Sequence, residues 1–152
     1  VQDKKQLQLV TQWGDIAWKD FNSSFKNCSN VDVNATDAPD LTDVNSLHSM
    51  FYYATKLKGN KYFNDWDVSS VTDMSAMFSD AAVFNQPVND WDVSSVTNMY
   101  GMFGHDFNQP LDKWNVSKVT DMSYMFNNAR AFNKPLNNWD VSSVTNMEAM
   151  FR

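Results

Sequence analysis

The chain contains repeated segments, here called copies, and the spacing of apolar residues changes within each copy. In the copy nearest the C-terminus, Trp139 and Val141 alternate with polar residues, which is typical of a short strand with one buried face. Val144, Met147 and Met150 then follow at intervals of three, which favours a short helix or 3-10 turn on a core. Each copy therefore predicts a strand, a turn, a short helix and a return loop.

Four clear copies of this pattern follow one another. Their tryptophans, Trp66, Trp91, Trp114 and Trp139, are spaced by 25, 23 and 25 residues. Such a period is typical of repeat folds in which each unit buries its apolar side against the next. We expect the α/β class, as a right-handed leucine-rich-repeat-like solenoid with one short parallel strand and one short helix or 3-10 turn per coil. The tryptophans and methionines would then belong to the core.

The pattern weakens toward the N-terminus. Residues 4–13 have a helical composition with apolar residues on one side. We therefore assign residues 1–38 to a helical N-terminal cap and residues 39–152 to the repeats, as about four to five coils. The sequence stops inside a unit, so we expect the native protein to continue. We also expect an open apolar coil at this end, through which two chains could associate.

Composition excludes several classes of function. The formal net charge is −6, which disfavours a nucleic-acid partner. No apolar run approaches the roughly 20 residues needed to cross a bilayer, so the chain is not predicted to span a membrane. Cys28 has no second cysteine, and the only histidines are His48 and His105. Because no nucleophile with a nearby base is evident, we expect no enzyme.

The aspartates that follow the tryptophans are the first candidate site. Asp67, Asp92 and Asp140 are expected on the strand face opposite the core, one above another at ~4.8 Å. Like charges at that distance repel unless they are compensated. Either neighbouring serine hydroxyls and amides absorb the charge, or calcium or a cationic partner does. The candidate binding face comprises Asp67, Ser69, Asp92, Ser94, Asn115, Ser117, Asp140 and Ser142.

The loops after the predicted helices vary most in length and form a second candidate site. Tyr52 and Tyr53 lie in the longest loop, whereas the loop at 104–106 is short. Variable loops on a constant frame are common places for binding. The two tyrosines are therefore candidate binding residues, although they could equally pack against the cap.

Asparagine recurs near the start of each copy and has a structural interpretation. A stacked asparagine can satisfy backbone groups of the neighbouring coil. We expect this role for Asn60, Asn85, Asn108 and Asn133.

The copies resemble a known family. Phe-Asn-Gln-Pro-Leu followed by Trp-Asn-Val-Ser-Lys-Val-Thr-Asp-Met-Ser-Tyr-Met-Phe, at 107–126, closely resembles the surface-protein repeat of the BspA-like leucine-rich-repeat group. That repeat belongs to a domain of unknown function found in Mycoplasma, Listeria and other bacteria. The resemblance covers about residues 39–152. It implies a secreted, wall-anchored or lipoprotein surface protein, with relatives implicated in adhesion and no established catalytic residues.

Together these features predict a cell-surface or secreted protein-binding or adhesion module that presents an extended repeat surface to a protein or cell-surface ligand. The alternative is a passive structural spacer or stalk that carries other domains, with calcium as a stabilising ion. A concave face whose residues differ from coil to coil would favour recognition, whereas near-identical exposed positions favour a spacer.

Overall fold

The computed structural model describes residues 4–152, so residues 1–3 of the predicted cap lie outside the described residues. Its named elements are the strands β1 (Leu9–Val10) and β2 (Asp32–Val33) and the 3-10 helix η1 (Lys61–Asp65). Turns and irregular segments make up nearly all the rest. The predicted leucine-rich-repeat-like α/β solenoid, with a strand and a helix in every coil, is therefore wrong.

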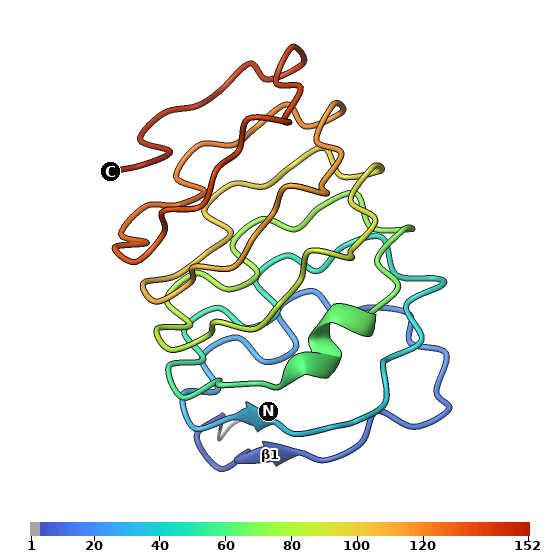
Figure 1. Ribbon diagram of the computed structural model, residues 1–152. Helices are drawn as coiled ribbons and strands as arrows, with labels where there is room; N and C mark the ends of the chain where they lie inside the picture. Colours follow the sequence, from blue (N-terminus) through green and yellow to red (C-terminus); the bar gives the residue numbers. More distant parts are fainter. Residues whose placement is uncertain (1–3) are drawn as a thin grey trace.

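Successive copies nevertheless lie one above another, from the N-terminal copies to the C-terminal ones (Figure 1). Outside β1 and β2, parallel pairing between copies is limited to single-residue bridges in residues 4–152. Besides a bridge between Ala17 and Asp40, these form one column through Ser46, Asp73, Asn98, Asp121 and Asn146. The column lies after the second valine of each copy, not at the Trp-x-Val segment where strands were predicted.

The segments expected to be helical form a different structure, which we call the turn ribbon. It comprises residues 47–53, 74–80, 99–105, 122–128 and 147–152. In the second segment the Met77 N–H donates to the Met74 carbonyl at 3.2 Å, which closes a turn. The next N–H, that of Phe78, instead donates to Met102 of the following copy at 2.9 Å. An α-helix directs its N–H groups back along its own chain, so this sharing between copies replaces the helix.

Backbone dihedrals explain how the turn ribbon avoids a helix. Ala76 and Asp80 have φ of 53° and 55°, and Tyr124 and Asn128 have φ of 58° and 60°. This left-handed region is uncommon for residues with a Cβ. Here the hydrogen bonds to the same turn and to the next copy hold the backbone in it. A left-handed residue every four positions interrupts any right-handed helix.

The predicted helical cap is also wrong within the described residues. Leu9–Val10 form β1 and pair in parallel with β2, with Leu9 opposite Asp32. The N–H of Asp32 donates to Gln8 and that of Asn34 donates to Val10, both at 2.9 Å. A neighbouring segment 24 residues away in the sequence thus satisfies these backbone N–H groups, as neighbouring copies do later in the chain.

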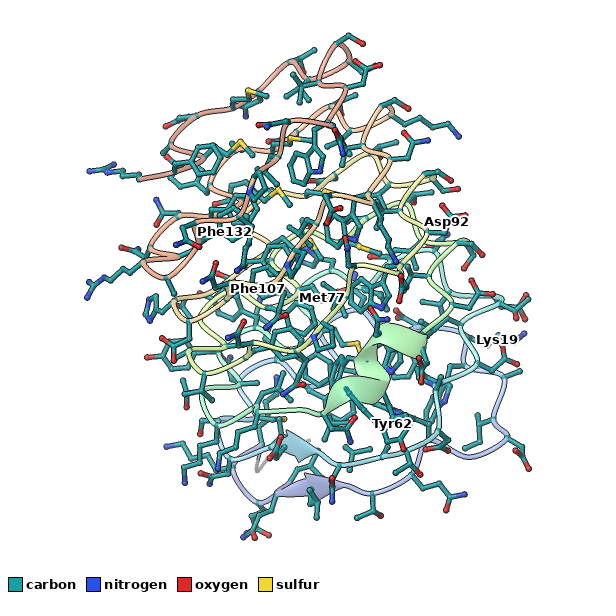
Figure 2. The ribbon with its side chains drawn as sticks, viewed as in Figure 1. Lys19, Tyr62, Met77, Asp92, Phe107 and Phe132 are labelled. Carbon is teal, nitrogen blue, oxygen red and sulfur yellow. The ribbon has the colours of Figure 1, made fainter. Side chains whose placement is uncertain are left out.

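The core contains aromatic, methionine, valine and leucine side chains from successive copies (Figure 2). The ring centroids of Trp91 and Trp114, and those of Trp114 and Trp139, lie 6.4 Å apart with nearly parallel planes. Trp66, Trp91 and Trp114 are buried, which confirms their predicted core role. Indole N–H groups also join the copies, since Trp114 Nε1 donates to the Val88 carbonyl at 2.9 Å.

The last copy exposes apolar side chains, as expected. Phe151 is 65% exposed, and Met147 and Val141 are 44% and 40% exposed. The equivalent residues of earlier copies are covered by the copy that follows. Association of two chains through this end stays a prediction.

Candidate binding surfaces

The predicted aspartate face is exposed, but it is built from turns. We call these the Asp-Ser turns, at 67–69, 92–94, 115–117 and 140–142. In the first, Asp67 Oδ1 accepts from the Ser69 N–H at 3.1 Å and from the Ser69 hydroxyl at 2.6 Å. The second and fourth repeat the backbone bond at 3.0 Å. Asn115 makes the same pair of bonds with Ser117, at 3.2 and 2.8 Å, without a charge.

These hydrogen bonds favour the charged carboxylate. The pKa of Asp92 lies below its usual value because the Ser94 hydroxyl and N–H donate to it, and Ser142 has the same effect on the pKa of Asp140. The structure thus shows turn hydroxyls and amides compensating the charge, the first of the two alternatives. Within residues 4–152, no group of three or more histidine, cysteine, aspartate or glutamate side chains is placed to hold a metal ion. The calcium candidates Asp67, Asp92 and Asp140 therefore do not form such a group.

Polar side chains beside the Asp-Ser turns also serve contacts between copies. The hydroxyls of Thr97 and Thr120 each donate to the threonine carbonyl one copy earlier, at 3.2 and 3.1 Å. The expected asparagine role is confirmed for Asn85, whose Oδ1 accepts from the Asn108 N–H at 2.9 Å, and Asn108 does the same for Asn133. These groups hold the frame together.

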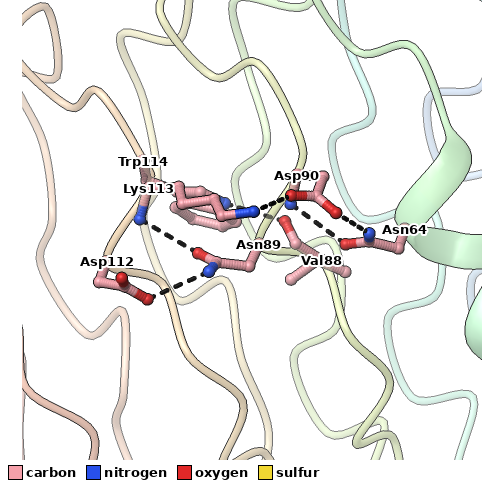
Figure 3. A network of polar contacts seen from close by, with 7 residues as sticks. All are labelled: Asn64, Val88, Asn89, Asp90, Asp112, Lys113 and Trp114. Atoms are coloured by element: carbon pink, nitrogen blue, oxygen red, sulfur yellow. Dashed lines mark hydrogen bonds and ion pairs between the residues drawn. The ribbon is translucent and has the colours of Figure 1, made fainter.

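The segments that lead into the tryptophans carry a further polar network (Figure 3). Asp90 accepts from Asn64 of the copy before and from Lys113 Nζ of the copy after, the latter at 2.5 Å. Asn89 donates to Asp112 at 3.1 Å. The pKa of Asp90 is lowered by its bond to Lys113 first and by Asn64 second. This network also joins three successive copies.

The turn ribbon, by contrast, changes its polar side chains from copy to copy. The position two residues after each bridge in the column holds His48, Ser75, Tyr100, Ser123 and Glu148. The following position holds Ser49, Ala76, Gly101, Tyr124 and Ala149. These positions therefore differ in size, charge and aromatic character between most copies, although Ser75 and Ser123 are the same residue type. Tyr100 and Glu148 are exposed, whereas Ser49, Ser75 and Ser123 are buried.

A small cleft, which we call the notch, opens on this ribbon across three copies. Its volume is about 150 Å³. The rings of Tyr100 and Tyr124 lie 5.6 Å apart at 52° to each other. On another side, His105 Nε2 lies 3.9 Å from Asp80 Oδ1. The lining residues are Ser79, Asp80, Tyr100, Gly101, Phe103, Gly104, His105, Tyr124, Asn127 and Asn128.

Two glycines shape the notch. Gly101 stands where the neighbouring copies carry Ala76 and Tyr124, and a Cβ added to it would meet nothing within 4 Å. At Gly104 a Cβ would lie 3.1 Å from the Phe78 carbonyl oxygen, so the backbones of two copies approach closely there. This copy has the 23-residue spacing. Sequence reasoning noted its short loop without assigning a site, although two of the chain's four glycines fall here.

The predicted pair Tyr52 and Tyr53 lies on the same ribbon, in an earlier copy. Tyr53 is 50% exposed, and Tyr52 is half-buried. Lys26 Nζ lies 5.0 Å from the centre of the Tyr52 ring, so this ring contacts the N-terminal region while its neighbour faces solvent. Tyr53 occupies the ribbon position of Asp80, His105 and Asn128.

Stacked copies with a shared core and a variable outer ribbon define a repeat protein. The chain belongs to the family described as "Mycoplasma protein of unknown function, DUF285", whose family model matches residues 19–106 and 104–152. No curated protein and no solved structure matches the chain. Among the described residues, no helix has the length and apolar character needed to span a membrane.

Proposed function

We propose that this chain is a non-catalytic recognition module that binds a protein or cell-surface ligand through the turn ribbon. The observation that supports this is the variation of the ribbon from copy to copy, set against the uniform Asp-Ser turns. A repeat protein can use the same residues in every copy for its own hydrogen bonds. A ligand of irregular shape, by contrast, is contacted best by side chains that differ between copies.

The location that fits this proposal is the cell surface or the surrounding medium. It rests on the resemblance to BspA-like surface repeats, which also suggests an adhesin or lipoprotein. We therefore propose adhesion as the biological setting of the binding activity.

The second candidate is a passive spacer, with or without calcium. The monotony of the Asp-Ser turns favours it, because every one of them uses its polar groups on its own turn. A spacer has no need for the variation on the ribbon.

The deciding experiment compares the two faces in one binding assay. The ribbon variant combines Asp80→Asn with Tyr100→Ser, which introduce the residues that a later copy carries at the same positions, Asn128 and Ser123. The control combines Asp67→Asn, Asp92→Asn and Asp140→Asn, following the pattern of Asn115. Binding of the labelled chain to cultured animal cells is measured by flow cytometry.

We expect the ribbon variant to bind about tenfold more weakly, since a few residues dominate most interfaces. The control should bind like the unchanged chain. If the unchanged chain bound neither cells nor matrix proteins, this result would support the passive spacer. A loss confined to the Asp-Ser control would contradict binding through the ribbon.

A further inference from the structure

We propose that the notch receives an arginine or lysine side chain presented by the protein partner. This proposal rests on the proposed function and specifies the chemistry that the ribbon recognises.

One wall of the notch is aromatic. Tyr100 is 44% exposed, so much of its side chain is open to a ligand. Its ring lies 5.6 Å from that of Tyr124, and both residues line the notch. A cation beside a tyrosine face is attracted by the ring quadrupole, and a guanidinium can also stack on it.

The charge around the notch also favours a cation. Asp80 lines it directly, and Glu148 lies just beyond Tyr124, whose hydroxyl donates to the Glu148 carboxylate at 2.7 Å. No lysine or arginine is among the lining residues of the described chain. Arg152 is the cation that acts on Tyr124 from outside this lining. The net charge of −6 also attracts a basic partner over longer range.

The size of the notch fits a single side chain. A cleft of about 150 Å³ accepts one side chain and excludes a helix or strand. Gly101 has no side chain to occupy the notch. The equivalent residue one copy later is Tyr124, whose φ of 58° is close to the 55° of Gly101. His105 lies on another side of the notch, with Nε2 3.9 Å from Asp80 Oδ1. The alternative occupant of the notch is a neutral sugar, because tyrosine rings and amide groups also bind sugars.

The test uses small probes and the intact chain. N-acetyl-arginine amide is titrated to about 50 mM, a range suited to a single side chain of weak affinity. N-acetyl-citrulline amide has nearly the same shape without the charge, and methyl glucoside represents the sugar. Backbone amide shifts of Gly101 and Gly104 are followed by nuclear magnetic resonance.

We expect saturable shifts with the arginine probe only. Asp80→Asn should weaken binding several-fold. Gly101→Tyr, followed through the Gly104 amide, should abolish binding by filling the notch. Unchanged spectra elsewhere in the chain show that each variant is folded, and Asp92→Asn is the matched variant on the other face. No saturable shift with arginine, an equal response to citrulline, or a response to the sugar alone would overturn the proposal.

The outcomes also separate this proposal from the proposed function. Cell binding that depends on the ribbon but is unaffected by Gly101→Tyr would overturn the arginine site alone. Arginine binding at the notch with no cell binding by the unchanged chain would support the site and count against the adhesion module.

Discussion

The Asp-Ser turns and the turn ribbon belong to the same copies and rest on the same core, yet they use their polar groups differently. In the Asp-Ser turns, each carboxylate or amide accepts hydrogen bonds from the serine two residues later. In the turn ribbon, alternate backbone N–H groups supply the regular contacts between copies. The side chains differ from copy to copy and add contacts of their own, such as that of Tyr124 with Glu148. Because the backbone groups of the ribbon are paired with one another, exposed ribbon side chains are available to contact a ligand.

The largest loss of stability is expected in the core, on which both the Asp-Ser turns and the turn ribbon rest. Trp114 is buried between the rings of Trp91 and Trp139 and donates to Val88 at 2.9 Å. Trp114→Ala should lower the free energy of unfolding by ~3–5 kcal/mol through lost packing and a cavity. Urea denaturation followed by circular dichroism measures this change. Trp139→Ala is the control, and an equal loss there would show that depth in the stack does not matter.

An intermediate effect is expected at the close approach behind the notch. Gly104→Ala places a Cβ 3.1 Å from the Phe78 carbonyl oxygen, so it should destabilise the fold by ~1–3 kcal/mol. Gly101→Ala is the comparison variant, because its Cβ meets nothing within 4 Å and its only expected cost, ~1 kcal/mol, comes from its φ of 55°. Thermal unfolding of the two variants compares them. If both lost the same stability, the contact at Gly104 would not be the cause.

A smaller effect is expected from titrating the Asp-Ser turns. The pKa of Asp92 is lower in the folded chain, chiefly through the Ser94 hydroxyl. The charged form therefore stabilises the fold above the unfolded pKa, and this contribution is lost as pH falls through the folded pKa. Asp92→Asn should flatten the stability curve slightly below about pH 4. Urea midpoints at several pH values test this, with Asn115→Asp expected to steepen the same curve.

The smallest effect is expected from calcium. Because the carboxylates of the Asp-Ser turns already accept hydrogen bonds, and no three-ligand group occurs in residues 4–152, the melting temperature should not change on adding calcium to chelator-stripped protein. A rise of several degrees would instead support the calcium-stabilised spacer. The triple variant Asp67→Asn, Asp92→Asn and Asp140→Asn should abolish any such rise.

Sequence reasoning identified the parts of the fold that depend on side-chain identity. The copy length, the buried tryptophans and the asparagine contacts between copies all follow from residues that recur at the same place. The Asp-Ser turns were identified as exposed, with serine compensation as one alternative. The notch was missed because it depends on the absence of a side chain at Gly101 and Gly104 and on side chains that come from three copies.

The amino-acid sequence by itself determined the repeat interval and which side chains enter the core, since both follow from the order of apolar and polar residues. Only the tertiary structure decided the local backbone. A Val-x-x-Met-x-x-Met spacing suits a helix as well as a ribbon of turns. The ribbon forms because every second N–H finds a carbonyl in the next copy, a partner that exists only once the copies are stacked.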